Sequence, residues 1–263
     1  MPIAGEAANP GGFFDGLVEL EGLSLLNLSC EAPQFTVHRL VQEVTRLRQD
    51  SAQEPHELEA ALAWINAVFV GDPQDVRSWP VLEPLEPHAK AVANFADRAG
   101  IAGATAELLS QVGTLLLVKA DYDEAEPLLR RALQIDEDSY GQDHPAVARD
   151  LNNLAVLLQN NNRLAEAEPM YRRALQIDEA SYGQNHPHVA RDLNNLAGLL
   201  QTTNRLADAE PLMRRAFVIF LSSLGVDHPN SQTVLGNYGK ILQAQGLSKE
   251  EIKARIASLI PKD

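Results

Sequence analysis

The chain has 263 residues, of which 45% are hydrophobic, and its 36 acidic and 22 basic residues give a net charge of −14. This hydrophobic content is enough for a sizeable core, whereas the acidic balance argues against nucleic acid and anionic membranes as partners. The single cysteine, Cys30, forms no internal disulfide and no multi-cysteine zinc site, so we expect a reducing, cytoplasmic location. Because alanine and leucine dominate the apolar residues, helices are expected rather than sheets.

Residues 1–50 differ in pattern from the rest of the chain and predict a small helix and β-hairpin segment. Residues 26–30 and 34–37 alternate between apolar and polar side chains on either side of a Glu-Ala-Pro turn. Leucines at helical spacing precede this hairpin over 17–26, and a second apolar stripe follows it over 40–47. Helix, hairpin and helix in this order are typical of part of a winged-helix fold.

Residues 51–102 predict a degenerate helix pair that connects this segment to the rest. An apolar stripe over 58–69 indicates the first helix, and Trp79-Pro80 is a typical start for the second. A Gly-Asp-Pro turn at 71–73 separates them. On the second helix we expect one apolar stripe to be buried, formed by Leu82, Leu85, Ala89, Val92 and Phe95.

A repeat of 42 residues is the clearest feature of residues 103–245. His-Pro pairs begin at 144, 186 and 228, and residues 144–185 are identical to 186–227 at 27 of 42 positions. Such a fixed period is the signature of units that stack on their neighbours to bury a continuous core. A capping box of Ser-Lys-Glu-Glu at 248–251 opens a last helix, so we expect residues 246–263 to cap the array.

Each repeat predicts two helices joined by a tight turn. The histidine of each His-Pro pair caps the first helix, and proline at the first helical position loses no hydrogen bond. In one unit the polar run 160–162 ends this helix, and a second helix extends from Leu164 to Gly183. Ala155 and Ala197 are small enough to let the two helices approach closely. The first helix buries one stripe, formed by Leu151, Leu154, Ala155 and Leu158.

These residues resemble the signature of the tetratricopeptide repeat, which is carried by Leu151, Leu154, Ala155, Leu158, Ala167, Tyr171 and Ala174. The 42-residue period and the Tyr-Gly-Gln-x-His-Pro linker at 140–145 and 182–187 are similar to repeats of the kinesin light chain type. The resemblance implies an all-α, right-handed superhelical solenoid of helix pairs. It also implies that the first helices line a concave face that binds a protein or peptide.

A second resemblance concerns residues 25–42 and the Trp-Pro segment at 79–80. Both are similar to the end of the winged-helix part of NB-ARC signalling ATPases and to the segment that follows it. The resemblance implies that the chain is the C-terminal part of such a protein, either as a fragment or as a separate gene product. No lysine follows a glycine-rich loop, so an ATPase domain is absent from this sequence.

No catalytic, cofactor-binding or metal-binding set is found in the sequence, and we expect neither an enzyme nor a cofactor. The His-Pro histidines are expected to act as helix caps, because copies in neighbouring repeats are about 10 Å apart, too far to share a metal. His56-Glu57 begins like a zinc-protease motif, but position 60 holds alanine instead of the second histidine.

A peptide-binding groove is predicted on the side of each first helix opposite its apolar stripe. Arginine there suits carboxylates and asparagine suits an extended backbone, so the ligand is expected to be an acidic or C-terminal peptide. The candidate groove residues are Arg149, Asn152, Asn153, Val156, Asn160, Arg191, Asn194, Asn195, Thr202 and Asn237.

Two alternatives stay open from the sequence alone. Arg149-Asp150 and Arg191-Asp192 are either ligand contacts or plain surface charges, and in both cases replacing the arginines should leave stability nearly unchanged. The chain is either a protein-interaction scaffold or the sensor region of a nucleotide-dependent switch of the NB-ARC type.

Overall fold

The computed structural model describes residues 26–28, 35–37 and 55–260. The chain divides into two units, Met1–Glu57 and Leu58–Asp263, which are described separately.

The first unit contains a two-stranded antiparallel hairpin. Strands β1 (Leu26–Leu28) and β2 (Phe35–Val37) pair with Leu26 opposite Val37. The alternating sequence therefore predicts this hairpin correctly. The expected helices over 17–26 and 40–47 lie outside the described residues, apart from Leu26, which belongs to β1.

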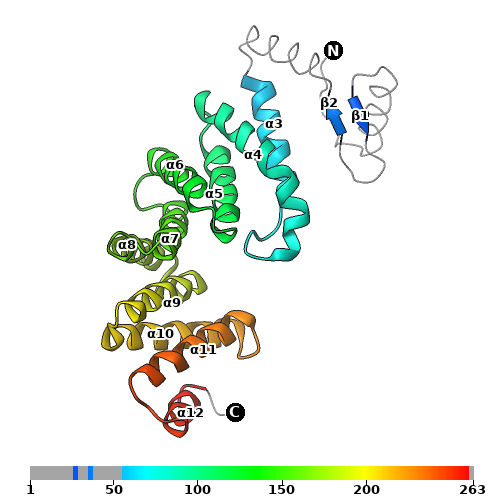
Figure 1. The fold of residues 1–263 in the computed structure, drawn as a ribbon. Helices are drawn as coiled ribbons and strands as arrows, with labels where there is room; N and C mark the ends of the chain where they lie inside the picture. The colour runs from blue at the N-terminus through cyan, green and yellow to red at the C-terminus, as the bar shows by residue number, and fades with distance from the viewer. Residues whose placement is uncertain (1–25, 29–34, 38–54, 261–263) are drawn as a thin grey trace. The chain divides into compact units, whose positions relative to one another are not determined.

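The described residues contain ten α-helices and one short 3₁₀ helix (Figure 1). Their bounds are α3 (Pro55–Val68), η1 (Val76–Ser78), α4 (Trp79–Arg98), α5 (Gly103–Val118), α6 (Tyr122–Tyr140), α7 (Pro145–Asn160), α8 (Leu164–Tyr182), α9 (Pro187–Thr202), α10 (Leu206–Leu224), α11 (Pro229–Ala244) and α12 (Lys249–Ala257).

Helices of the second unit form pairs that stack on one another. Helix α5 packs on α6, α7 on α8 and α9 on α10, while α6–α7, α8–α9 and α10–α11 contacts join successive pairs. The buried hydrophobic residues run through this stack from Leu62 to Leu242. This is the array of helix pairs that the 42-residue period predicts. The proposed boundaries at 103–245 and 246–263 fall between helices, and they stay a prediction.

The His-Pro pairs begin first helices in the predicted way. In α7 the His144 Nδ1 atom accepts a hydrogen bond from the Ala146 N–H at 3.2 Å, and His186 and His228 act identically in α9 and α11. The His144 ring also stacks on Tyr140, with ring centroids 4.5 Å apart. The capping role is confirmed, and it accounts for these histidines without a metal.

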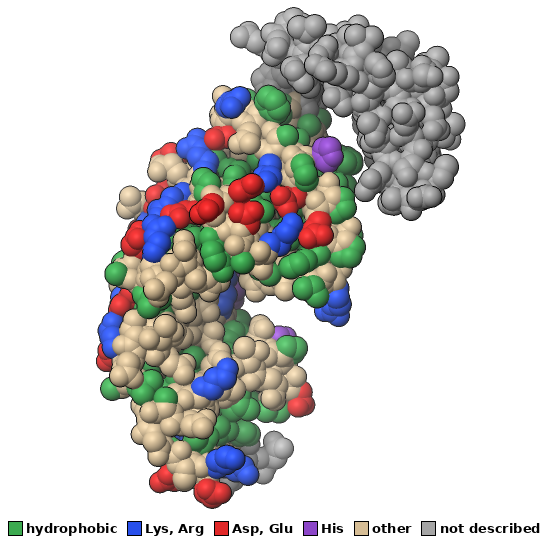
Figure 2. Space-filling model, in the orientation of Figure 1, with side chains coloured by type: hydrophobic (Ala, Val, Ile, Leu, Met, Phe, Trp, Pro, Cys, Tyr) green, Lys and Arg blue, Asp and Glu red, His purple; other side chains and the backbone are tan. Residues whose placement is uncertain are grey.

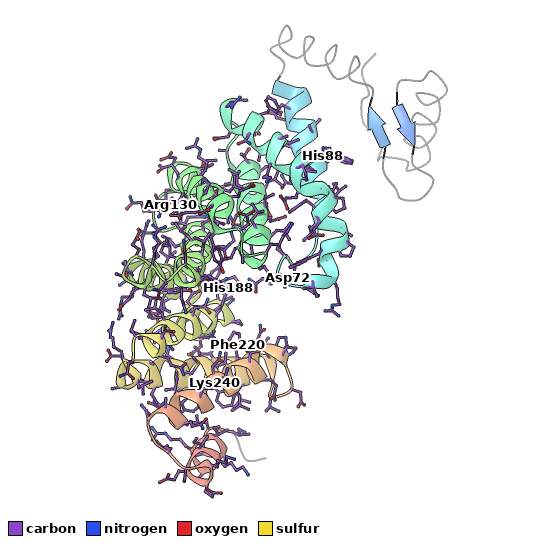
Figure 3. All side chains as sticks on the ribbon, in the orientation of Figure 1. Asp72, His88, Arg130, His188, Phe220 and Lys240 are labelled. Atoms are coloured by element: carbon purple, nitrogen blue, oxygen red, sulfur yellow. The ribbon has the colours of Figure 1, made fainter. Side chains whose placement is uncertain are left out.

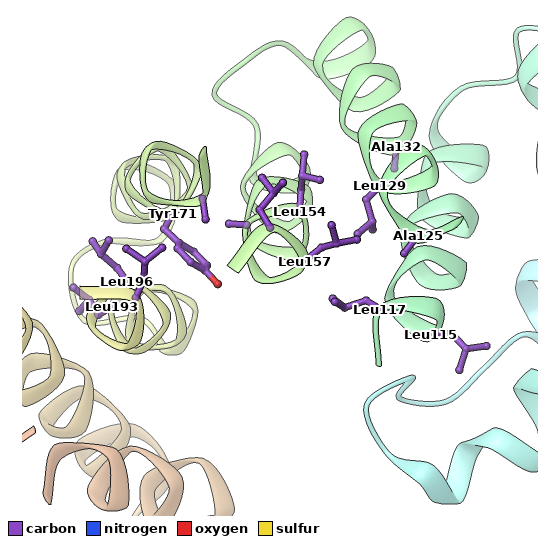
Figure 4. Packing of buried hydrophobic residues seen from close by; sticks show 14 of the residues in the cluster. Leu115, Leu117, Ala125, Leu129, Ala132, Leu154, Leu157, Tyr171, Leu193 and Leu196 are labelled. Carbon is purple, nitrogen blue, oxygen red and sulfur yellow. The ribbon is translucent and has the colours of Figure 1, made fainter. Parts of the chain in front are cut away.

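Small residues allow the two helices of each repeat to approach closely. Ala155 and Ala197 are fully buried, and the corresponding Gly113 is tighter still, since an added Cβ would lie 2.7 Å from Leu129 Cδ2. Figure 4 shows Tyr171, which occupies the position of Leu129 one repeat later, between α7 and α9. A large residue on the second helix therefore fills the space that the small residue leaves.

One predicted stripe needs correction. Phe95 of α4 is 58% exposed, whereas Ala93 and Ala96 on the same helix are fully buried together with Leu82 and Ala89. Buried positions 82, 89, 93 and 96 follow the helical period, and residue 95 lies about 100° away from residue 96 around the axis. Alanine thus faces the neighbouring helix where the sequence suggested phenylalanine.

Replacing Ala197 by leucine should destabilise the array, because α10 leaves no space for a larger side chain there. We expect the free energy of unfolding to fall by about 1–3 kcal/mol, measured by urea denaturation. The neighbouring Gly198 is the control, because an added Cβ meets nothing within 4 Å and Gly198→Ala should stabilise the helix by up to about 1 kcal/mol. Equal midpoints for Ala197→Leu and the unmodified chain would contradict the assigned contact.

Candidate functional site

The first helices of the repeats line two adjoining cavities on one side of the array. Figure 2 shows this unit hollowed between the part that contains α4 and the part that contains α11. The larger cavity, about 590 Å³, is lined by Gln74, Leu117, Val118, Tyr122, Asn152, Asn153, Val156, Asn160, Arg191 and Asn195. The smaller, about 270 Å³, is lined by Val156, Gln159, Asn160, Tyr171, Asn194, Asn195, Gly198, Gln201, Met213, Asn237 and Lys240.

Eight of the ten residues proposed from the sequence line these cavities. The exceptions are Arg149 and Thr202, and the Thr202 hydroxyl donates to the Gly198 carbonyl at 3.0 Å instead. Sequence reasoning missed Gln74, which lies in the loop that Asp72 marks in Figure 3. It also missed Lys240 of α11, because the repeat pattern is weak in that helix.

The asparagines form a ladder of side-chain hydrogen bonds from one repeat to the next. Asn195 Nδ2 donates to Asn152 Oδ1, and Asn237 Nδ2 donates to Asn194 Oδ1, both at 3.0 Å. Asn153 Nδ2 donates in the same way to the Ser110 hydroxyl at 3.3 Å. Partners in each pair are 43 residues apart, one more than the repeat. This 43-residue offset can be read from the sequence. The hydrogen bonds of the ladder hold the asparagine side chains of the groove wall in fixed orientations.

Arg149 and Arg191 are bound to buried acids instead of facing outward freely. Arg149 Nη2 lies 3.2 Å from Asp136 Oδ2, and its Nε lies 3.1 Å from Asp150 Oδ1. Arg191 contacts Asp178 at 3.3 Å and Asp192 at 2.9 Å. The four aspartates are at most 2% exposed, so the expectation of plain surface charges is wrong. Asp136 and Asp178 lie on the second helix of the preceding repeat, which packs against the first helix that carries the arginine.

Burial makes the carboxyl groups of Asp150 and Asp192 harder to ionise. Loss of hydration raises the pKa of Asp150 to about 6 and that of Asp192 to about 7, although each adjoining arginine opposes the rise. The Ser110 hydroxyl donates to Asp150 Oδ1 at 2.9 Å and favours its ionised form. At the corresponding place in the second cluster stands Asn152, which accepts a hydrogen bond from Asn195, so no hydroxyl donates to Asp192 there.

The part of the chain that the structure describes contains neither a metal-binding cluster nor a membrane-spanning helix. Among residues 58–260 no group of three or more His, Cys, Asp or Glu side chains is arranged to hold a metal ion. None of the described helices is long and apolar enough to span a bilayer.

The fold and the two cavities define a class of protein, a helical-repeat array with one hollowed face. Residues 104–180 and 151–220 match the tetratricopeptide repeat family, so this part of the chain consists of tetratricopeptide repeats. Such arrays generally bind other proteins through extended concave surfaces and are typically non-catalytic.

Several solved structures are similar to this chain. BtubC (BKLC) from P. vanneervenii shares 20% identity, with a TM-score of 0.58 over 79% of this chain and 92% of that one. The nearly identical repeats of a protein assigned as a kinesin light chain in Podospora anserina share 16%, with a TM-score of 0.60 over 79% and 95%. No curated protein sequence matches. At these identities the likeness establishes the fold, and the NB-ARC resemblance stays a prediction.

Replacing Arg149 or Arg191 by alanine should lower stability, because a buried carboxylate would lose its cation. We expect a loss of roughly 1–3 kcal/mol in the free energy of unfolding at pH 8, measured by urea denaturation. Arg172→Ala is the control, since its ion pair with Glu168 is exposed and its removal should change stability by less than about 0.5 kcal/mol. Identical urea midpoints of unfolding for Arg191→Ala and Arg172→Ala would show that Arg191 does not stabilise the buried Asp178 and Asp192.

Proposed function

We propose that the array is a protein-interaction module that binds an acidic peptide segment, or a peptide's C-terminal carboxylate, along the two cavities. One observation carries the proposal. The described residues that line the cavities include two cations, Arg191 and Lys240, and no carboxylate. In a chain of net charge −14, a lining without carboxylates attracts an anionic ligand more than the rest of the surface does, and Lys240, which makes no ion pair among residues 58–260, contributes most of this attraction.

The asparagine ladder supports binding of an extended backbone. Each asparagine amide carries two N–H donors and an acceptor oxygen, and a ladder bond uses one donor. Asn153, Asn195 and Asn237 therefore keep a second N–H for a ligand carbonyl. Because the ladder holds these amides in fixed orientations, a ligand loses less free energy in ordering them.

The dimensions of the groove also suit a peptide. Val156, Asn160 and Asn195 line both cavities, so the two form one continuous surface. Packed helices are about 8–10 Å apart, and an extended chain advances about 3.3 Å per residue. About three peptide residues would therefore pass each helix, and the amides of successive repeats would meet successive segments of the ligand.

A regulatory role in an NB-ARC type switch is the second candidate. It is supported by the hairpin of β1 and β2, which a winged-helix segment requires, and by the sequence resemblance. In both cases we place the protein in the cytoplasm, with a protein rather than nucleic acid as its partner. Capture of partners from the source cell separates the two candidates, because a scaffold retains many partners and a sensor retains one.

A negative charge at the shared wall of the cavities should weaken binding of acidic peptides. Asn160 lines both cavities, and no hydrogen bond of its side chain is found among the described residues, so Asn160→Asp adds charge without removing a contact. We expect the dissociation constant of a labelled Glu-rich peptide to rise about three- to tenfold at low salt, measured by fluorescence anisotropy.

Asn161→Asp is the matched control. It adds the same charge one residue further along the chain, where it lines neither cavity. A neutral peptide of equal length should bind more weakly than the acidic one to every variant. Equal loss of affinity in both variants, or no preference for acidic peptides, would contradict the proposed site.

A further inference from the structure

Two successive repeat junctions contain the same buried cluster of two aspartates and one arginine. In each, one aspartate comes from the second helix of a repeat, and the arginine and the other aspartate begin the next repeat. The first acid cluster is Asp136, Arg149 and Asp150 at the α6–α7 junction, and the second is Asp178, Arg191 and Asp192 at the α8–α9 junction.

The charges of each acid cluster do not balance when both carboxyl groups are ionised, because a single guanidinium faces two carboxylates. The two carboxyl groups share one guanidinium, because Arg149 contacts both Asp136 and Asp150, and Arg191 contacts both Asp178 and Asp192. One oxygen of each has no hydrogen-bond donor among the described residues. A proton between the two groups would supply the donor and cancel the excess negative charge, which is expensive to bury.

Few other ionisable groups face the clusters. Glu107 of α5 adds a negative charge near Asp136 and so favours proton uptake. At the second cluster, burial raises the pKa of Tyr171 of α8, so its hydroxyl stays neutral. Burial and the Arg191 charge lower the pKa of His188 of α9, so its imidazole is neutral near pH 7 as well. Asp192 is then the group of the second cluster that titrates near pH 7, and His188 gains its proton only at a lower pH.

The third junction shows that stacking does not require these acids. At the corresponding positions, 42 residues after the second cluster, α10 and α11 carry Phe220, Thr233 and Val234. Phe220 and Val234 are buried in the hydrophobic core, at 4% and 2% exposure. The chain thus contains an apolar version of the same junction, and the clusters differ from it in their ability to bind a proton.

We propose that each acid cluster is a proton-binding site, which holds one proton between its carboxyl groups at mildly acidic pH and releases it as the pH rises to 8. Proton release leaves an uncompensated buried negative charge at each of the two junctions. Stacking of the repeats should therefore weaken as the pH rises.

The second cluster also connects this proton to the groove, a consequence that rests on the proposed function. Arg191 lines the larger cavity, and its two aspartates lie behind it. With the proton bound the cluster is neutral, and after release its charge is −1. Acidic peptides should therefore bind more tightly at pH 6 than at pH 8.

Proton uptake is tested without a ligand, by urea unfolding between pH 5 and pH 8. Unfolded aspartates are already ionised at pH 5, so the folded chain carries up to one extra proton per cluster. From pH 5 to pH 6 the unfolding equilibrium constant should rise about fivefold through the first cluster, where the pKa of Asp150 is about 6, and close to tenfold through the second, where the pKa of Asp192 is about 7. Asp150→Asn and Asp192→Asn, which keep the side-chain volume and cannot titrate, should each remove the rise that belongs to their own cluster.

The control is Asp143→Asn, which removes an exposed acid outside both clusters and should keep the full pH dependence. Should Asp192→Asn not fold, the triple variant Asp178→Phe, Arg191→Thr and Asp192→Val installs the apolar junction and should lose the same rise. If Asp150→Asn and Asp192→Asn show the same pH dependence of unfolding as the unmodified chain, the proposal of proton-binding sites is overturned.

Peptide binding measured at pH 6 and pH 8 separates the proposed effect of the proton on the groove from the proton-binding sites themselves. Affinity for a Glu-rich peptide should rise severalfold from pH 8 to pH 6, and Asp192→Asn should bind at pH 8 as the unmodified chain binds at pH 6. Tight binding without this pH dependence, alongside normal proton uptake, would overturn the connection to the groove. Absence of peptide binding, with normal proton uptake, would overturn the proposed function and leave the proton sites intact.

Discussion

Close approach of the two helices in each repeat depends on one position of the first helix, where the side chain is a single methyl group or a hydrogen. Gly113, Ala155 and Ala197 occupy it in successive repeats. Because the backbones come this near, a large residue of the second helix reaches across to the next repeat, as Tyr171 does. The spacing between repeats, and therefore the alignment of their groove residues, is set by this contact.

Because the repeats are equally spaced, polar side chains at equivalent positions of successive repeats form a row along the array. The ladder is one such row, and the exposed face has another, in which Glu126 and Glu168 each bind the arginine four residues later and an arginine of the next repeat. Single exposed ion pairs contribute little, about 0–1 kcal/mol. Their repetition matters because every ion pair requires the same alignment of neighbouring repeats, so a shift of one repeat along the next would break all of these pairs together.

Sequence alone predicted the features that depend on one helix. Its helix starts at His144 and Ser248, and the buried Ala155, follow from local chemistry and from periodicity. It could not predict that Arg149 binds Asp136, because a helical wheel for α7 takes no account of the helix that precedes it. The face opposite the core of one helix pair is partly the contact surface for the neighbouring pair. The asparagine ladder needed the same knowledge of stacking.

Because neighbouring repeats contribute partners to the groove residues, Arg191 and Lys240 differ in how much positive charge they offer to a ligand. Arg191 is bound to Asp178 and Asp192, so its charge is at best cancelled within its own cluster. Lys240 on the exposed face of α11 makes no ion pair among residues 58–260, and its amine lies 3.5 Å from the Asn237 amide oxygen. The attraction for an anionic ligand is therefore stronger at the α11 end, while the middle of the groove offers neutral amides. A ligand with its acidic group at one end and an uncharged backbone along the rest matches this distribution.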